Sequence, residues 1–252
     1  MHRFYIRQQD LTQETAFIQG QDARHLSHVL RLTIGDHVEL ADGDGTCWEA
    51  CIMSMDAKTV ELSLLSRTVS RGESPVSITV AQGMLKDKKM DMIIRHLTEL
   101  GITQWVPFFA HRSIPRPDPK KLVARVDRWR RISREAMKQC KRSQLPLIME
   151  PVSFEALLDL SKDHDKKIAF WEKGCIPFGN INTEPSSLPQ KIIVLIGPEG
   201  GFLETEIEAA QAAGFSAFSL GSRILRAETA SLTACSLVQH YFGDLGKKDL
   251  DT

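Results

Sequence analysis

Two glycine-bearing loops near the C-terminus hold the residue types best suited to binding a small ligand. The first reads Gly197-Pro-Glu-Gly-Gly-Phe202, and the second reads Leu220-Gly-Ser-Arg-Ile-Leu-Arg-Ala-Glu-Thr-Ala230. Glycines let the backbone approach a ligand closely and leave N–H groups free to donate hydrogen bonds. Because both loops also carry Glu, and the second carries Arg as well, we interpret them as walls of one site rather than as simple turns. Neither a G-x-G-x-x-G fingerprint nor a P-loop occurs, so these residues leave the ligand open.

Each loop follows a predicted strand and opens into a predicted helix. The apolar run 191–197 has the pattern of a strand buried on both faces, and 215–220 is the next strand. Helices are expected over 205–214 and 226–242. Open α/β sheets bind their ligands at the carboxyl ends of parallel strands, which is where these loops belong.

Residues 76–243 alternate between strand and helix patterns, which predicts an α/β domain with a mainly parallel sheet. Besides the elements already named, we expect strands at 76–85, 103–110 and 166–172 and a helix at 88–101. In the C-terminal helix, Leu232 and Phe242 fall outside the main apolar stripe. Either they face a second copy of the chain or they fill the domain's own core.

Residues 1–70 have a different pattern, with five short strands and one helical segment at 22–32. The Asp-Gly steps at 42–45 suit a hairpin turn, and closely spaced strands favour a small barrel. Residues 70–75 are the expected linker. The helical segment places Arg24, His25, His28 and Arg31 on a positively charged rim.

The formal net charge is zero, but the charges are segregated along the chain. Residues 120–142 hold ten Lys or Arg against two acidic residues, in a pattern that predicts an amphipathic helix. Arginine matches the oxygens of phosphate, so we expect RNA contacts from this helix, with a solvated charged face as the alternative. The predicted RNA-binding residues of this segment are Arg125, Arg128, Arg131 and Arg142.

Composition excludes several other classes of protein. No apolar run approaches the roughly 20 residues of a membrane span, and the N-terminus lacks a signal-peptide pattern, so we expect a cytoplasmic protein. Five cysteines without a C-x-x-C pair are read as reduced thiols. His25 and His28 have no second ligand pair, so no metal site is expected.

Four segments together resemble the RsmE family of 16S ribosomal RNA methyltransferases. They are 86–113, 128–146, 196–206 and 220–230, in that order behind a small β-rich domain, and 25–36 also resembles the family's N-terminal segment. The resemblance implies a PUA-like RNA-binding β-barrel at 1–70 and a SPOUT α/β methyltransferase domain with a trefoil knot at 76–243. It also implies S-adenosylmethionine as methyl donor, N3 of a uridine in 16S rRNA of the small subunit as acceptor, and a homodimer.

By this resemblance, the donor pocket is formed by residues of the two loops and the strand ends before them. These are Leu195, Gly197, Gly200, Gly201, Leu220, Gly221, Ile224, Leu225 and Arg226. Phe170 and Trp171 should lead into a third wall.

Uracil N3 carries a weakly acidic proton that must leave at or before methyl transfer. A carboxylate can accept it, or a guanidinium can favour the anionic ring. The candidates for this catalysis are Arg112, Glu199, Arg226 and Glu228, although the two glutamates equally suit helix N-termini.

The chain departs from the family in segment 135–142, where Lys138 and Lys141 stand in place of an acidic residue and a glycine. Two other functions share many of these features: a ribose 2′-O methyltransferase of the same superfamily, and a non-catalytic ribosome-assembly factor.

Overall fold

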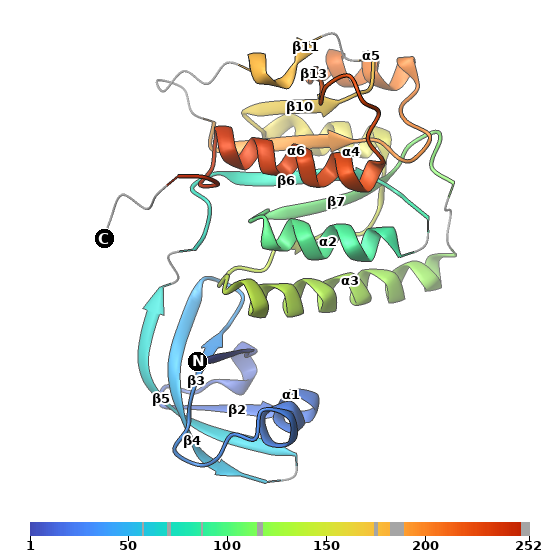
Figure 1. The fold of residues 1–252 in the computed structure, drawn as a ribbon. Helices are drawn as coiled ribbons and strands as arrows, with labels where there is room; N and C mark the ends of the chain where they lie inside the picture. Colours follow the sequence, from blue (N-terminus) through green and yellow to red (C-terminus); the bar gives the residue numbers. More distant parts are fainter. Residues whose placement is uncertain are drawn as a thin grey trace. The chain divides into compact units, whose positions relative to one another are not determined.

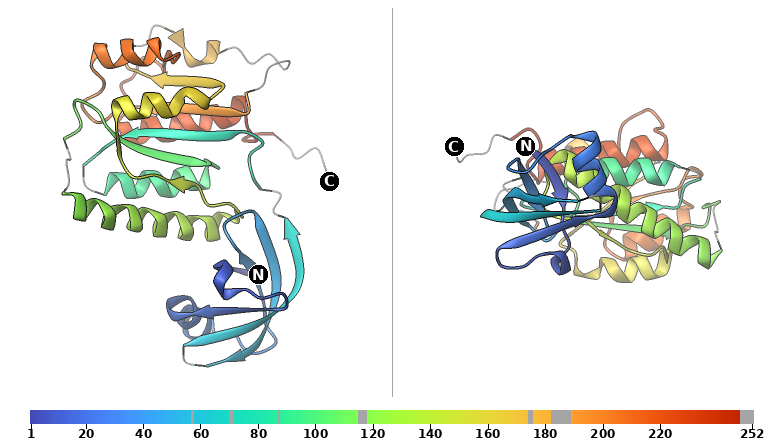
Figure 2. Two further views of the ribbon diagram at one scale, coloured as in Figure 1. Left: turned by 180° about the vertical axis from the view of Figure 1, so that it is seen from behind. Right: turned by 90° about the horizontal axis from the view of Figure 1, so that it is seen from below.

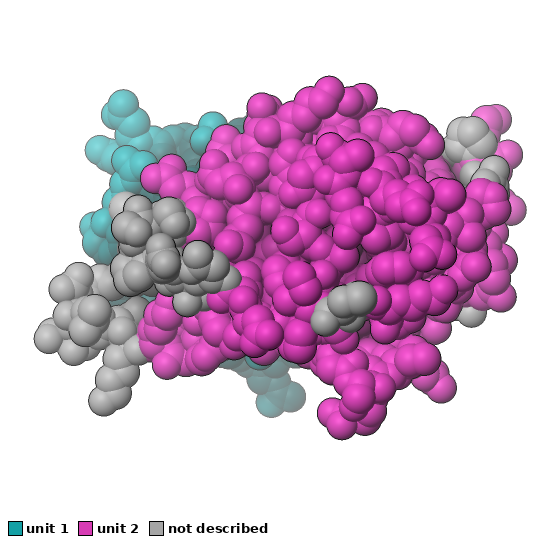
Figure 3. Space-filling model, turned by 90° about the horizontal axis from the view of Figure 1, so that it is seen from above, with its two compact units in different colours: residues 1–73, 134–145 teal, residues 74–133, 146–252 magenta. Residues whose placement is uncertain are grey.

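The chain divides into two units in the computed structural model, which describes residues 1–56, 58–69, 72–86, 88–114, 118–173, 176–181 and 189–247. The first unit comprises residues 1–73 and 134–145, and the second comprises 74–133 and 146–252 (Figure 3). The expected domain ranges 1–70 and 76–243 stay a prediction. The expected linker includes residues 70 and 71, which lie outside the described residues.

The first unit is built on a curled five-stranded sheet in the order β1-β3-β4-β5-β2 (Figures 1 and 2). Its strands are β1 (His2–Tyr5), β2 (Thr15–Gln19), β3 (His37–Ala41), β4 (Thr46–Met55) and β5 (Thr59–Val69). Strand β1 runs parallel to β3, and the other neighbours are antiparallel. Strands β1 and β2 are the two edges of this sheet, so the small barrel expected from the sequence takes the form of a half-barrel.

The predicted elements of this unit are present. The turn between β3 and β4 is the expected Asp-Gly hairpin, in which Asp42 Oδ1 accepts hydrogen bonds from the backbone N–H groups of Asp44 and Thr46. Helix α1 (Gly20–Arg24) continues into a π-helical turn (His25–Val29). Alternate strand residues such as Val38 and Leu62 are buried in the unit's core, which is the pattern of a sheet with one covered face.

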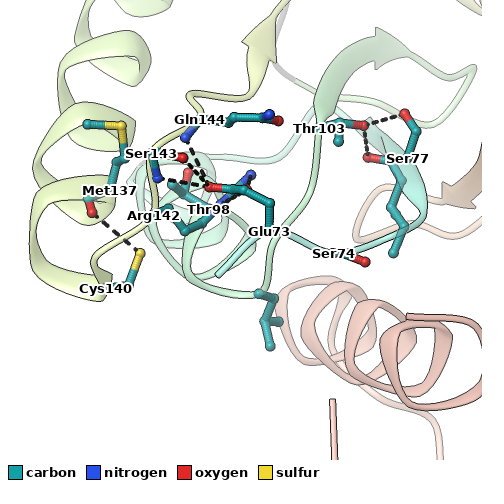
Figure 4. Close-up of polar contacts among 12 residues, drawn as sticks. Glu73, Ser74, Ser77, Thr98, Thr103, Met137, Cys140, Arg142, Ser143 and Gln144 are labelled. Atoms are coloured by element: carbon teal, nitrogen blue, oxygen red, sulfur yellow. Dashed lines mark hydrogen bonds and ion pairs between the residues drawn. The ribbon is translucent and has the colours of Figure 1, made fainter. Parts of the chain in front are cut away.

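A buried ion pair ties residue 73 to the segment that follows helix α3 (Pro119–Cys140) (Figure 4). Glu73 Oε2 accepts from Arg142 Nε at 2.9 Å and pairs with its Nη2 at 2.8 Å. Glu73 Oε1 accepts from the backbone N–H groups of Ser143 (2.8 Å) and Gln144 (3.0 Å). Arg142 is only 3% exposed, so the expected RNA contact is wrong for this residue, because its guanidinium is committed to Glu73.

The second unit is built on a parallel sheet in the order β11-β13-β10-β12-β6-β7-β8, with β9 also paired to β7. Its strands are β6 (Ser77–Gly83), β7 (Gln104–Phe109), β8 (Leu147–Ile148), β9 (Val152–Ser153), β10 (Lys166–Phe170), β11 (Ile176–Pro177), β12 (Lys191–Ile196) and β13 (Ser216–Ser219). Every described pairing in this sheet is parallel. The predicted strands are therefore confirmed, and their carboxyl ends share one edge.

Helices cover both faces of this sheet (Figures 1 and 2). Helices α2 (Lys89–Glu99), α6 (Ala227–Tyr241) and the N-terminal part of α3 pack on one apolar cluster, while α4 (Phe154–Leu160) and α5 (Glu204–Ala212) pack on another. Strand β12 supplies Ile192, Val194 and Ile196 to the first cluster and Ile193 and Leu195 to the second. This explains its continuous apolar sequence.

Helix α6 uses its extra apolar residues inside its own unit. Phe242 is 2% exposed within the first cluster, and Leu232 packs against that cluster. The idea that Phe242 faces a second copy is therefore wrong, while for the partly exposed Leu232 it stays a prediction. The trefoil knot stays a prediction, since strand order alone does not describe how the chain is threaded.

Candidate functional site

A cavity of about 450 Å³ lies at the carboxyl edge of the parallel sheet. Its walls come from the segments that follow three neighbouring strands, β13, β10 and β12. The loop after β12 contributes 197–202, the loop after β13 contributes 220–226, and the end of β10 contributes 170–172. The predicted third wall from Phe170 and Trp171 is thus present, and β10 lies between the strands that carry the two glycine loops.

The structure brings most of the predicted site residues to this cavity. The residues that line it are Gly197, Glu199, Gly200, Gly201, Leu220, Gly221, Ile224, Leu225, Arg226 and Glu228. Leu195 differs, because strand alternation turns its side chain into the apolar cluster on the opposite face with Phe202. Its neighbour Ile196 lines the cavity instead.

The first loop is held in place by close contacts at its glycines. Gly201 has a positive φ of 67°, and a Cβ on it would lie 2.9 Å from Glu172 Oε1. At the end of β6, a Cβ on Gly83 would lie 2.6 Å from the backbone nitrogen of Pro198. Gly83 therefore needs to be glycine for packing against backbone, and Gly201 is favoured as glycine by its positive φ.

Gln82 connects the first loop to helix α6 beneath the cavity. Its fully buried side chain donates from Nε2 to the carbonyls of Gly83 (3.0 Å) and Gly197 (3.3 Å). Its Oε1 accepts a hydrogen bond from Ser231 Oγ in α6. Sequence reasoning missed this residue; the available signal was a single amide within the apolar run 76–85.

Lys89, also missed, joins the two predicted glutamates. Its Nζ lies 2.6 Å from Glu199 Oε1 and 3.5 Å from Glu228 Oε2. The hydrogen bond to Glu199, together with the attraction of both carboxylates, raises the pKa of Lys89 above its usual value. Nothing in the helix pattern of 88–101 distinguishes Lys89 from the neighbouring Lys88. The partners of Lys89 are therefore visible only in the structure.

Two buried polar atoms of cavity-lining residues have no hydrogen-bond partner among the described residues. They are Trp171 Nε1, a donor, and Glu228 Oε2, an acceptor. Buried polar atoms are nearly always hydrogen-bonded in folded proteins. Trp171 Nε1 is thus a donor left for a bound ligand, while Glu228 Oε2 has the charge of Lys89 Nζ beside it at 3.5 Å.

Arg112 supports the first loop without lining the cavity. Its Nη1 donates to the carbonyl of Gly200 at 3.0 Å, and its Cβ lies 3.0 Å from where a Cβ on Gly200 would be. Its contacts therefore favour a role in positioning the loop.

The predicted RNA-binding residues lie in both units. In the first, Arg24, His25, His28 and Arg31 are all exposed around α1 and its π-helical turn. In the second, Arg131 is exposed on α3 and Arg125 is half-buried. Arg128 Nη2 pairs with Asp91 Oδ2 of α2 at 2.6 Å, so part of its charge is already balanced.

The two lysines that depart from the family pattern have local roles in the first unit. Lys138 Nζ lies 2.8 Å from Glu135 Oε1 and 3.2 Å from Asp22 Oδ1. Lys141, just beyond α3, has a positive φ of 61°, a backbone conformation in which glycine is ordinarily favoured.

The described residues contain no group of three or more His, Cys, Asp or Glu side chains placed to hold a metal ion. Within the same part of the chain, no helix has the length and apolar character that a membrane span requires.

The chain is similar to known RNA methyltransferases along most of its length. The family model of an RNA methyltransferase domain matches residues 72–239, and that of an RNA methyltransferase PUA domain matches residues 18–65. Ribosomal RNA small subunit methyltransferase E of Bacillus subtilis is 33% identical over 248 residues, covering 95% of this chain and 96% of that protein. The protein of the same name from Synechocystis is 31% identical, covering 94% and 77%. Among solved structures, the chain is similar to a ribosomal RNA small subunit methyltransferase E from Neisseria gonorrhoeae that was crystallised bound to S-adenosyl methionine. The two sequences are 30% identical, the TM-score is 0.86, and the match covers 97% of this chain and 99% of that one.

Proposed function

The chain belongs to the RNA methyltransferase family, among the ribosomal RNA small subunit methyltransferases E, and on this premise we propose its reaction. It transfers a methyl group from S-adenosylmethionine to N3 of a uridine in the 16S rRNA of the small ribosomal subunit. The observation that supports this most directly is the cavity at the ends of β10, β12 and β13, where both family motifs meet. An rRNA substrate also implies that the enzyme works in the cytoplasm.

The residues of the cavity fit the proposed donor. Backbone N–H and C=O groups of the two glycine loops suit the polar edge of an adenine, and Leu220, Ile224 and Leu225 offer apolar surface to its faces. Trp171 Nε1, which has no hydrogen-bond partner among the described residues, is a donor for a polar group of the ligand. When bound, the donor supplies a methyl group activated by a positively charged sulfur.

The chain's own groups then orient the acceptor and handle its proton. Arg226 lines the cavity beside Glu228, where its guanidinium can stabilise negative charge on uracil oxygens. Arg112 holds the first loop through Gly200. The exposed arginines of α3 and of the α1 region support phosphate contacts with the RNA.

The active form is proposed to be a homodimer, as the family resemblance implies. Ile224 at the cavity is 84% exposed and Ile176 of β11 is 49% exposed. These exposed apolar side chains support a second subunit that covers this part of the second unit.

The test is product analysis after incubating the purified protein with small subunits and methyl-labelled S-adenosylmethionine. The expected product is N3-methyluridine, which blocks Watson–Crick pairing and stops primer extension. A ribose-methylated nucleoside would identify the superfamily's other activity and contradict the N3 assignment. No donor binding by calorimetry would instead favour a non-catalytic assembly factor.

A further inference from the structure

Three carboxylates line the cavity: Glu172, Glu199 and Glu228. The two that follow the glycine loops differ in the partners of their oxygens. Glu199 Oε1 is hydrogen-bonded to Lys89 Nζ at 2.6 Å, and Glu199 Oε2 accepts a longer bond of 3.4 Å from the backbone N–H of Lys86. Both oxygens of Glu199 are therefore engaged by donors from the segment that begins α2. A carboxylate held in this way is stabilised as an anion and is a poor acceptor for a further proton.

Glu228 Oε2 has only a longer contact with the same lysine among the described residues. Its side chain is 13% exposed, and Oε2 is buried. The Lys89 ammonium, at 3.5 Å, supplies charge attraction but a contact too long for a good hydrogen bond. A favourable interaction with the α6 dipole explains an acidic residue in this first turn, but it does not explain why a buried acceptor has only this long contact.

We propose that Glu228, and not Glu199, accepts the proton of uracil N3, and that Lys89 is a positioning residue that keeps Glu199 out of this role. The proposal rests on the function proposed above and assigns one proton acceptor within it. In the step, the N3–H bond breaks and its proton passes to Glu228 Oε2, while the N3 electron pair forms the new bond to carbon. The methyl–sulfur bond breaks with its electrons left on sulfur, so the positive sulfur and the negative carboxylate are both neutralised.

Several charged groups surround this acceptor and will influence the step. Lys89 approaches it from α2, and Glu199 lies beyond Lys89 on the loop after β12. Arg223 and Arg226 line the same cavity from the loop after β13, and Glu172 does so from the end of β10. At neutral pH uracil remains protonated at N3, so the reaction needs an acceptor; at alkaline pH the ring ionises without one.

Two isosteric variants, Glu228→Gln and Glu199→Gln, form the matched test. Methyl transfer is measured in a single turnover with saturating S-adenosylmethionine and small subunits. We expect Glu228→Gln to lower the rate by about a hundredfold or more, the usual contribution of a general base, and Glu199→Gln by less than about tenfold. Affinities for S-adenosylhomocysteine and for RNA, measured without turnover, should change little in either variant.

A substrate with a more acidic N3–H separates proton transfer from structural damage. Fluorine at C5 withdraws electrons from the uracil ring, so RNA that contains 5-fluorouridine ionises more readily at N3. The rate of Glu228→Gln should recover toward that of the wild type on this RNA, and should rise about tenfold per pH unit on ordinary RNA until uracil itself ionises. Glu199→Gln should show neither response.

Three results would overturn the assignment. The first is a wild-type rate of methyl transfer in Glu228→Gln, and the second is a loss of rate in Glu228→Gln that 5-fluorouridine RNA leaves unchanged. The third is a loss of rate in Glu199→Gln that is larger than in Glu228→Gln and is restored by 5-fluorouridine RNA. If Glu228→Gln loses S-adenosylhomocysteine binding, Glu228→Asp replaces it, and a rate insensitive to uracil acidity in that variant rejects the idea. A wild-type protein that forms no N3-methyluridine would contradict the proposed function itself, which is a separate outcome.

Discussion

Gly201 and Gly221 both have positive φ but lie in different surroundings, which makes them a matched pair. A Cβ on Gly201 would meet Glu172, whereas a Cβ on Gly221 would meet nothing within 4 Å. Either Val substitution should cost on the order of 1–3 kcal/mol in backbone strain. We expect Gly221→Val to remain folded and lose S-adenosylhomocysteine binding, because its side chain enters the cavity. Gly201→Val should lose little further stability, because the exposed Glu172 carboxylate can move aside. Thermal unfolding and calorimetry check both, and undiminished binding by Gly221→Val would show that this loop is only a turn.

Lys89 should be energetically coupled to Glu199. Since the pair is about one-third exposed, Lys89→Met alone should lower the free energy of unfolding by about 1 kcal/mol or less. Once Lys89 is absent, Glu199→Gln should have little further effect on stability. Denaturant unfolding of the four proteins of this double-mutant cycle measures the coupling, and Lys89→Arg, which keeps the charge, is the control. Strict additivity would show that the contact contributes nothing.

Prediction from sequence succeeded for single residues that belong to a motif and failed for those that act through distant partners. The glycines and Glu228 were found because two loops carry them as short contiguous patterns. Gln82 and Lys89 contact residues more than a hundred positions away, and neither periodicity nor composition encodes such pairings. Arg142 was misassigned because a buried ion pair and a phosphate contact call for the same side chain.

At the scale of elements, helix α3 was predicted with its apolar stripe, but its charged side chains are not equivalent. Arg131 is exposed and Arg125 is half-buried, while Arg128 is paired with Asp91 of α2. We expect Arg125→Glu with Arg131→Glu to weaken RNA binding and to flatten its salt dependence by roughly one unit of slope per lost phosphate contact. Arg128→Gln is the control and should leave the slope nearly unchanged. Filter-binding titrations across salt concentrations measure this, and an unaltered slope in the double variant would remove α3 from the RNA surface.

Where β10 begins, at the sheet edge opposite the cavity, a half-buried histidine should make the free energy of unfolding depend on pH. Burial lowers the pKa of His164 below its ordinary value, and the nearby charges of Lys191 and Lys167 lower it further. The hydrogen bond with Ser161 and the charge of Asp163 oppose this shift but do not outweigh it. Its Nε2 is 3.0 Å from Thr79 Oγ1. Because the unfolded chain binds this proton more readily, stability should be full above about pH 6.5 and fall as pH drops toward the folded-state pKa. Urea unfolding at pH 7.5 and 5.5 should show a smaller loss in His164→Gln; equal losses would contradict the prediction.

At the scale of the whole molecule, the order and type of elements could be predicted because strand and helix patterns alternate regularly after residue 76. The division into units could not. Contacts assign residues 134–145 to the first unit although they continue a helix that begins in the second. A helical pattern states which face is apolar, but not which of two cores will receive it.

The proposed dimer predicts complementation between defective chains. A Gly221→Val chain lacks donor binding, and a chain with Arg24→Glu and Arg31→Glu lacks exposed positive charge in the first unit. If RNA held by one subunit reaches the other's cavity, mixing the two should restore methylation beyond either parent. Mixtures no more active than their parents, or full activity from a monomer in analytical ultracentrifugation, would count against a shared site.

The assignment of 134–145 to the first unit also has a consequence for folding during synthesis on the ribosome. The five strands of the half-barrel emerge early, but residues that pack on them are synthesised some seventy residues later. Met137 and Leu145 pack on Ala41 and Cys47, and Arg142 pairs with Glu73. At about 5–20 residues per second, the nascent sheet waits several seconds with the apolar patch at Ala41 and Cys47 uncovered. We therefore expect stalled chains ending near residue 100 to bind chaperones through this patch, and chains that extend well past residue 145 to release them.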